Sequence, residues 1–168
     1  MDPLTQGVLG ASLPQSLSKK KSLGIIGLIG FISGLAPDLD IFIRSDTDPL
    51  LFLEYHRQFT HSLIFIPIGG FICALFLFLI LGKKFNFSFK EIWFYATCGY
   101  ATHGLLDSCT SYGTLLFWPF NDTRIAWNNI SIIDPLFTIP ILVFILLASI
   151  KKNRLYAILA IFWAVLYL

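Results

Sequence analysis

The chain has 168 residues, of which 56% are hydrophobic and only 13% are charged, and its formal net charge is +2. An ordinary soluble domain is about 45–50% apolar and roughly 25% charged, so this chain has too little polar surface to cover a water-soluble globule. We therefore expect one integral-membrane domain over residues 1–168, with an all-α fold: a polytopic bundle of about four to six helices. The small net charge gives no indication of a nucleic-acid partner, and we expect none.

The first expected helix is short and runs from Pro3 to about Leu13, where Pro14 interrupts it. Asp2 is the expected cap, and Pro3 takes the first helical position. Such a helix does not reach across the ~30 Å of hydrocarbon in a bilayer. We expect it to lie at the membrane interface or to pack inside the bundle.

Longer apolar segments follow along the chain. Four membrane spans are predicted from their length and composition, at residues 22–36, 62–82, 91–108 and 135–150, and a short apolar segment covers 155–168. Small residues three or four positions apart let helices approach closely in lipid. The glycines of the 22–36 segment follow that spacing, at Gly24, Gly27, Gly30 and Gly34.

Basic residues predict the topology. Nine of the twelve lysines and arginines fall in three loops: Lys19, Lys20, Lys21, Lys83, Lys84, Lys90, Lys151, Lys152 and Arg154. The positive-inside rule assigns these loops to the cytoplasm. The protein is then a multi-pass protein of the inner (cytoplasmic) membrane, with the connector 38–61 and the loop 109–133 on the extracytoplasmic side.

The connector between the first two spans holds an unusual share of the polar side chains. Half of the ten acidic residues and two of the three histidines lie between residues 38 and 61. Within it, Asp48-Pro49 predicts the start of a helix over residues 48–58, by the same cap-then-proline signal. We expect this connector to carry the functional site, close to the outer leaflet.

The third histidine lies inside an apolar segment, four residues before an acid. This spacing puts His103 and Asp107 on one face of a helix. Ionisable groups within a membrane segment indicate a functional site by default. The alternative is a structural hydrogen bond between the two side chains within the bundle.

Asp38 and Asp40 follow Pro37 and offer two carboxylates, while His56 and His61 offer two imidazoles if a helix ends near residues 58–60. Taken singly, the acids fit a solvated helix end and the histidines fit an interfacial position. Together with His103 and Asp107, they form a mixed nitrogen and oxygen set that suits one or two divalent ions, zinc or manganese first. The predicted metal ligands are Asp38, Asp40, His56, His61, His103 and Asp107.

Such a metal centre supports hydrolysis. A metal with an open position lowers the pKa of water to about 7, and a carboxylate off the metal can act as general base. Arg57 either grips a phosphate and stabilises developing charge or anchors the chain at the interface. Asp134, before Pro135, fits a ligand or a helix cap. The candidate catalytic residues are Asp40, His61, Arg57 and Asp107.

Several motifs in order resemble the YdjM/YbcI family of bacterial and archaeal membrane proteins, which are regarded as metal-dependent hydrolases. They are MDPLTQGVLGA at residues 1–11, PDLD at 37–40, EYHRQFTHS at 54–62, THGLLDSCTSYGT at 102–114 and RIAWNNISIIDP at 124–135. The resemblance implies a multi-span inner-membrane protein with metal ligation on the six residues above. Many relatives have Thr-His where this chain has Thr5-Gln6, so it implies no strong ligand there.

The expected function is metal-dependent hydrolysis of a phosphoester or related bond in a lipid or lipid-linked substrate, with membrane lipid as the surrounding partner. The lipid part rests on the expected place of the site at the leaflet. One alternative is a metal or proton transporter, although the segments 62–82 and 135–150 carry no ionisable group. Another alternative is a non-catalytic membrane adaptor, which leaves the pair of His103 and Asp107 unexplained.

Overall fold

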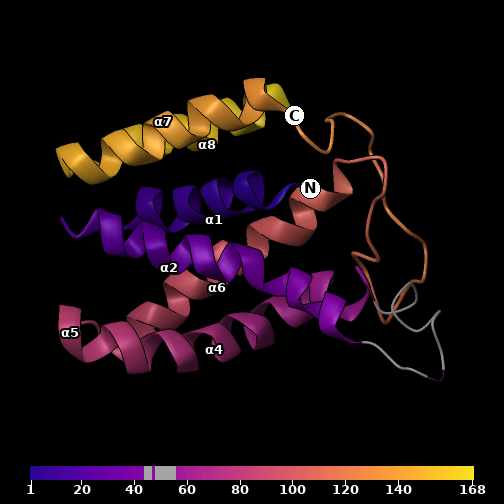
Figure 1. The fold of residues 1–168 in the computed structure, drawn as a ribbon, viewed down its shortest axis with the longest axis horizontal. Coiled ribbons are helices and arrows are strands. Elements are labelled where there is room, and N and C mark those ends of the chain that lie inside the picture. Colours follow the sequence, from indigo (N-terminus) through magenta and orange to yellow (C-terminus); the bar gives the residue numbers. More distant parts are fainter. Residues whose placement is uncertain (44–46, 48–55) are drawn as a thin grey trace.

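The computed structural model describes residues 1–43, 47 and 56–168. Within these ranges, six α-helices of at least twelve residues run roughly alongside one another (Figure 1). They are α1 (Pro3–Leu17), α2 (Leu23–Leu35), α4 (Ile66–Leu77), α6 (Phe89–Ser108), α7 (Pro135–Lys151) and α8 (Leu155–Tyr167). The described part of the chain has no β-strand, only an isolated bridge between Thr114 and Ile125. The expected all-α helical bundle is therefore confirmed.

Short helical turns extend two of these helices and carry part of the polar connector. The 3₁₀ segment η1 (Ala36–Phe42) continues α2, and η2 (Phe59–His61) and η3 (Leu63–Phe65) lead into α4. A π-helical segment, η4 (Phe78–Gly82), and the short α5 (Lys83–Phe85) complete that stretch. The helix predicted over residues 48–58 lies mostly outside the described residues.

The first helix is longer than the sequence predicted. Asp2 caps α1 as expected, because its side chain accepts a hydrogen bond from the Thr5 amide. The prediction that Pro14 ends the helix near Leu13 was wrong, since α1 continues to Leu17. Packing of a neighbouring helix supports this turn: a Cβ built on Gly30 of α2 would lie 2.5 Å from Pro14 Cγ. Of the two places expected for this helix, the structure has the one inside the bundle, where α1 contacts α2, α6, α7 and α8.

Three glycines let the backbones of α1, α2 and α6 touch. A Cβ on Gly30 would overlap the carbonyl oxygen of Gly10, and a Cβ on Gly99 would overlap that of Gly30. The glycine spacing predicted close approach for α2, and the structure confirms it. This contact brings the end of α2 beside the last two turns of α6, which is where the polar residues lie.

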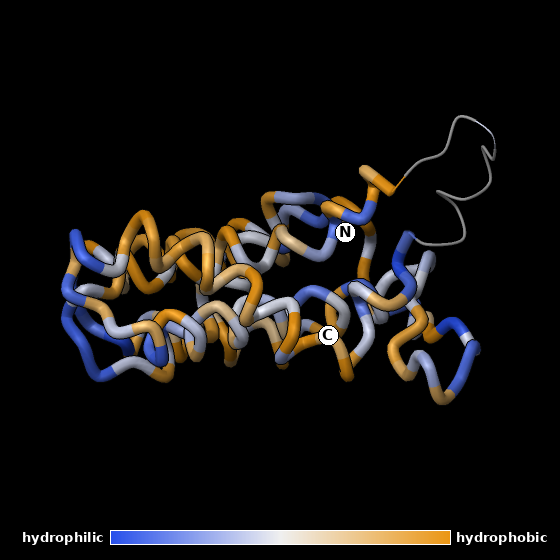
Figure 2. The backbone as a smooth tube through the Cα atoms, turned by 90° about the horizontal axis from the view of Figure 1, so that it is seen from below, coloured by the Kyte–Doolittle hydropathy of each residue, from blue (hydrophilic) through white to orange (hydrophobic). Residues whose placement is uncertain are grey.

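Two stretches of the described chain are long and apolar enough to cross a membrane, Leu23–Phe42 and Leu63–Phe85, judged by length and composition. The helices α7 and α8 are apolar but shorter, and α6 carries several polar groups. The prediction of four spans therefore stays a prediction. Figure 2 shows hydrophobic residues along the helical body and hydrophilic stretches at its two ends.

The three lysine-rich loops meet at one end of the bundle. Lys20 pairs with Glu91 at 2.6 Å, and a cavity of about 350 Å³ is lined by Lys19, Lys21, Lys152 and Arg154 among others. In Figure 1 the junctions between α1 and α2 and between α7 and α8 lie at this same end, with α5. The 3₁₀ segment η1, which carries the described acids Asp38 and Asp40 of the connector, lies at the opposite end.

Candidate metal centre

Three elements bring the predicted ligands to one place. The 3₁₀ turn η1 carries Asp38, η2 ends at His61, and the last turns of α6 carry His103 and Asp107. Pro37 lies in the first turn of η1, where its missing amide proton costs no helical hydrogen bond. The side chains of His61, His103 and Asp107 are fully buried, and that of Asp38 is 28% exposed.

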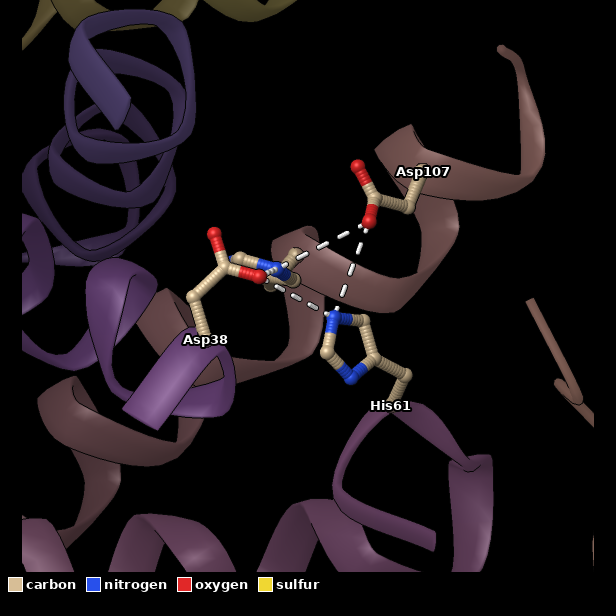
Figure 3. Close-up of side chains that lie close together, drawn as sticks. Asp38, His61 and Asp107 are labelled. Carbon is tan, nitrogen blue, oxygen red and sulfur yellow. Dashed lines mark ion pairs between the residues drawn. The ribbon is translucent and has the colours of Figure 1, made fainter. Parts of the chain in front are cut away.

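The four side chains point at a common spot, which we call the His–Asp cluster (Asp38, His61, His103 and Asp107). Asp38 Oδ1 lies 3.5 Å from His61 Nε2 and 3.3 Å from His103 Nε2. Asp107 Oδ2 lies 3.6 Å and 3.9 Å from the same two nitrogens. Figure 3 shows Asp38, His61 and Asp107 converging from separate segments of the chain. All four ligand atoms lie within 4.8 Å of one another.

These separations fit a metal ion better than hydrogen bonds. Protein hydrogen bonds that involve nitrogen usually span about 2.7–3.2 Å, whereas the cluster distances run from 3.3 to 3.9 Å. Ligands placed tetrahedrally at about 2.0–2.2 Å from a zinc ion stand roughly 3.3–3.6 Å apart. His61 Nε2, His103 Nε2 and Asp107 Oδ2 are also buried without a hydrogen-bond partner. The described residues therefore fit a divalent ion, and a simple hydrogen bond between His103 and Asp107 is absent at 3.9 Å.

A backbone carbonyl fixes the orientation of His103. Its Nδ1 lies 2.6 Å from the carbonyl oxygen of Gly34, which can only accept, so Nδ1 carries the proton. The Nε2 lone pair then faces the cluster, as a metal-binding imidazole requires. Gly34 and His103 each lie one turn beyond Gly30 and Gly99, so the close contact of α2 with α6 sets this hydrogen bond.

Asp40 and Thr60 orient His61 in a similar way. His61 Nδ1 lies 2.9 Å from Thr60 Oγ1 and 3.4 Å from Asp40 Oδ2, and Thr60 donates to that same oxygen at 2.7 Å. Burial by itself lowers the pKa of His61, but Asp38 and Asp40, with the charge of Asp107, raise it above its ordinary value. His61 Nε2, like His103 Nε2, is thus presented to the cluster.

The other oxygen of Asp107 is held by two groups from the start of the chain. The α-amino group of Met1 contacts Asp107 Oδ1 at 2.5 Å, and Gln6 Nε2 donates to the same oxygen at 2.8 Å. Oδ2 is left facing the cluster. Sequence reasoning considered Gln6 only as a weak ligand and missed this supporting role. The available signal in the sequence was the polar amide of Gln6 within a mostly apolar helix.

A second group of potential ligands adjoins the first and shares Asp38. It contains Asp38, Asp40 and His56, with ligand atoms within 4.8 Å of one another. His56 Nδ1 already lies 2.7 Å from Asp40 Oδ1, a hydrogen-bond distance. Asp40 Oδ2 accepts from the Arg57 amide at 3.0 Å and from Thr60. These contacts favour a positioning role for Asp40, and its predicted catalytic role stays a prediction.

Arg57 lies between the His–Asp cluster and an open pocket. Its backbone is left-handed (φ 63°), its Nε lies 3.3 Å from Asp107 Oδ2, and its buried Nη1 has no hydrogen-bond partner. A pocket of about 500 Å³ is lined by His56, Arg57, Tyr112 and Arg124. Arg124 was not among the predicted site residues. It opens the motif at residues 124–135, but the motif alone does not show that this loop folds back beside Arg57.

The remaining acids of the described chain do not join the cluster. Asp134 caps α7 by accepting from the Phe137 amide, and the Tyr167 hydroxyl donates to it. Of the two roles considered for Asp134, the structure therefore has the cap. Asp122 is exposed in the loop after α6. Asp46, Asp48 and Glu54 lie outside the described residues.

Comparison with known proteins adds a family to this geometry. A family model described as YdjM inner membrane protein matches residues 1–168. Inner membrane protein YbcI of Escherichia coli (strain K12) is 30% identical over an alignment of 108 residues, and the match covers 61% of this chain and 60% of that protein. The chain thus spans about three fifths of the length of this curated relative. No solved structure matches the chain.

Proposed function

Because the chain belongs to the YdjM inner membrane protein family and gathers buried histidines and acids at one end of its bundle, we propose that it is a membrane-embedded, metal-dependent hydrolase. Its substrate is a lipid or lipid-linked molecule, in which it hydrolyses a phosphoester or related bond. Zinc or manganese is the expected ion, held by the His–Asp cluster. We propose one ion, because Asp40 and His56 of the adjoining group already form a hydrogen bond with each other.

One observation supports this proposal above the others. Three fully buried atoms, His61 Nε2, His103 Nε2 and Asp107 Oδ2, face one spot without hydrogen bonds. A buried polar atom without a partner costs about 1–3 kcal/mol, and three at one place are a large penalty for a bundle of this size. A cation among them turns that penalty into binding energy, and mixed imidazole and carboxylate ligands suit zinc and manganese.

A bound ion of this kind makes water acidic enough to act as a nucleophile near neutral pH. The residues of the chain supply the rest. Asp40 and Thr60 hold His61 in place, and Gln6 holds one oxygen of Asp107. Of the four candidate catalytic residues, His61 and Asp107 bind the ion, Asp40 supports His61, and Arg57 faces the substrate. Cradled by these contacts, the cluster needs little rearrangement to bind metal.

The pocket beside Arg57 suits the anionic part of a substrate. Arg57 and Arg124 line it together with His56 and Tyr112. Guanidinium groups bind phosphate with two parallel hydrogen bonds, and Arg57 Nη1 is buried without a partner. Since Arg57 Nε also lies 3.3 Å from Asp107 Oδ2, a phosphate held by Arg57 sits next to the metal ligands.

The location at a membrane surface supports a lipid substrate. The apolar stretch Leu23–Phe42 includes η1 with Asp38, and Leu63–Phe85 begins two residues after His61, so both have one end at the cluster. The lysine-rich loops lie at the other end. With those loops in the cytoplasm by the positive-inside rule, the cluster faces the extracytoplasmic side of the inner membrane. The described stretch 63–82 has no charged residue or histidine, which disfavours an ion pathway along it.

Metal analysis followed by turnover tests the proposal. The purified full chain in nanodiscs is loaded with zinc or manganese and given a panel of phosphatidate, phosphatidylglycerol and polyprenyl diphosphate. We expect phosphate or alcohol release that stops in chelator and in His103→Ala, but continues in Asp122→Asn, an exposed-loop control. Metal uptake into liposomes without turnover would instead identify a transporter. No metal and no turnover would leave a membrane adaptor.

A further inference from the structure

An apolar groove runs between α2 and α4 from the polar end of the bundle. It consists of two adjoining cavities of about 290 and 400 Å³ that share Ala36, Leu39, Cys73 and Phe76. Phe65 lines the end of the groove beside the candidate metal centre, and Ile80 lines the end nearer the lysine-rich loops. We call this feature the α2–α4 groove. Leu39 and Phe76 are 61% and 66% exposed, so the groove opens toward the surrounding lipid.

The end of the groove at Phe65 is polar and reaches the candidate metal centre. Asp40, Thr60 and Tyr100 line it there, and the Tyr100 hydroxyl donates to the Thr60 carbonyl at 2.8 Å. Asp40 in turn lies 2.7 Å from His56, which lines the basic pocket beside Arg57. Only the pair of His56 and Asp40 therefore separates the groove from a head group bound in the basic pocket.

The length of the groove distinguishes a lipid chain from a protein helix. From Phe65 to Ile80 the rise of about 1.5 Å per residue gives roughly 22 Å. A partner helix that spans the membrane needs about 20 residues and the full ~30 Å of hydrocarbon. The groove stops short of that depth, and it begins at the polar site, as a lipid does with its head at the surface and its tail in the hydrocarbon.

We propose that the α2–α4 groove is the subsite for one hydrocarbon chain of the substrate lipid, with the anionic head group held at Arg57 and the metal centre. This inference rests on the proposed function, and it specifies the substrate as an amphipathic lipid that is read by its chain as well as its head. Cys73 lies at the centre of the groove, where both cavities meet, so it is the position to change.

Kinetics with two substrates test the groove in the full, metal-loaded chain. Cys73→Trp fills the groove, and Leu79→Trp adds the same side chain at a position of the same stretch that is 80% exposed and outside the groove. With dioleoyl phosphatidate, we expect Cys73→Trp to raise KM at least tenfold with kcat little changed, and Leu79→Trp to have no effect. Dibutyryl phosphatidate, whose chains are too short to enter, keeps its KM in both variants. Equal effects on both substrates, or none on the long one, overturn the inference.

Photolabelling gives an answer that does not depend on turnover. Phosphatidate and diacylglycerol that carry a mid-chain diazirine are bound at low molar ratio in nanodiscs, and the labelled peptides are identified by mass spectrometry. We expect phosphatidate to label α2 and α4 several-fold more than α8, whose Val165 is 72% exposed, and Cys73→Trp to remove that preference. Uniform labelling of the helices overturns the inference. Groove labelling without turnover on any substrate supports the subsite and contradicts the proposed hydrolase.

Discussion

The Nδ1 atom of His103 lies 2.6 Å from the carbonyl oxygen of Gly34, across the contact between α6 and α2. This hydrogen bond joins the packing of the bundle to the chemistry of the site. It exists because Gly30 and Gly99 let the two backbones touch one turn away. It also fixes the proton on Nδ1 and leaves Nε2 for the cluster, so a helix contact made of glycines determines a candidate metal ligand.

Removal of His103 is the most direct test of the cluster. His103→Ala takes away one nitrogen ligand and the anchor to Gly34, so we expect zinc affinity to fall by more than ~100-fold, beyond the loss typical of a supporting partner. Competition with a fluorescent chelator measures the affinity. Asp134→Asn changes the cap of α7 and the contact with Tyr167 but no residue of the cluster, so it serves as control and should bind zinc like the wild type. Unchanged zinc binding in His103→Ala would contradict the cluster.

Asp40 allows the supporting role to be separated from ligation. Both its oxygens are engaged by His56, Thr60 and the Arg57 amide. Asp40→Asn weakens the orientation of His61 but leaves the cluster ligands, so we expect zinc affinity to fall about 10–100-fold with the stoichiometry unchanged. Mass spectrometry of the metal-loaded protein gives the stoichiometry. The loss of one ion out of two would show that Asp40 is itself a ligand.

Gly104 is predicted to be essential for the position of His61. A Cβ at Gly104 would overlap the carbonyl oxygen of His61, so Gly104→Ala must push η2 away from α6. We expect a loss of about 1–3 kcal/mol in stability, as for overpacking, and weaker zinc binding. Thermal unfolding in detergent measures the first quantity.

A matched glycine provides the control for that variant. A Cβ at Gly24 in α2 would meet its nearest atom, Ser149 Cβ, at 3.8 Å, an ordinary contact. Gly24→Ala should therefore leave zinc binding intact and raise stability slightly, by less than about 1 kcal/mol, because Gly24 lies in the first turn of α2 and alanine loses less backbone entropy on folding than glycine. If both variants lose stability equally, the contact with His61 is not the cause.

The fold was largely predictable because it follows from hydrophobic segments and their punctuation. Asp2 and Asp134 correctly indicated where two helices start, and the glycines of α2 correctly predicted close packing of that helix. Pro14 misled the prediction, because only the neighbouring helix shows that a proline can be accommodated at that turn. The membrane orientation stays a prediction, since helical geometry alone does not place a bilayer.

The site was predictable in its membership more than in its roles. His103 and Asp107 stood out because charged groups are costly in apolar segments. The long-range partners were not visible: Gln6 supports Asp107 across 101 positions of sequence, and Arg124 joins the basic pocket from a distant loop. Such contacts depend on how distant segments of the chain pack together, which the local sequence does not show. Sequence reasoning also could not distinguish a ligand from its support, as Asp40 illustrates.

The last prediction concerns pH and the opposite responses of metal-free and metal-bound protein. The carboxylates that face His61 come from η1 (Asp38 and Asp40) and from α6 (Asp107), and they raise its pKa above the ordinary value of 6.5. Because the folded protein binds the His61 proton more tightly than the unfolded chain, protonation of His61 stabilises the fold. This contribution is complete below about pH 6.5 and is lost as the pH rises through the raised pKa. In chelator, we therefore expect Tm to fall as the pH rises from about 6.5 through the raised pKa.

Zinc should reverse this trend. The ion binds only after His61 loses its proton, so zinc affinity grows with pH, and the stabilisation by excess zinc grows with affinity. The difference in Tm with and without zinc should therefore widen from pH 6 to pH 8, as measured by thermal unfolding in detergent. His61→Gln, which does not titrate, should flatten both curves. A zinc-induced shift in Tm that stays constant over this range would show that His61 does not exchange its proton for the ion.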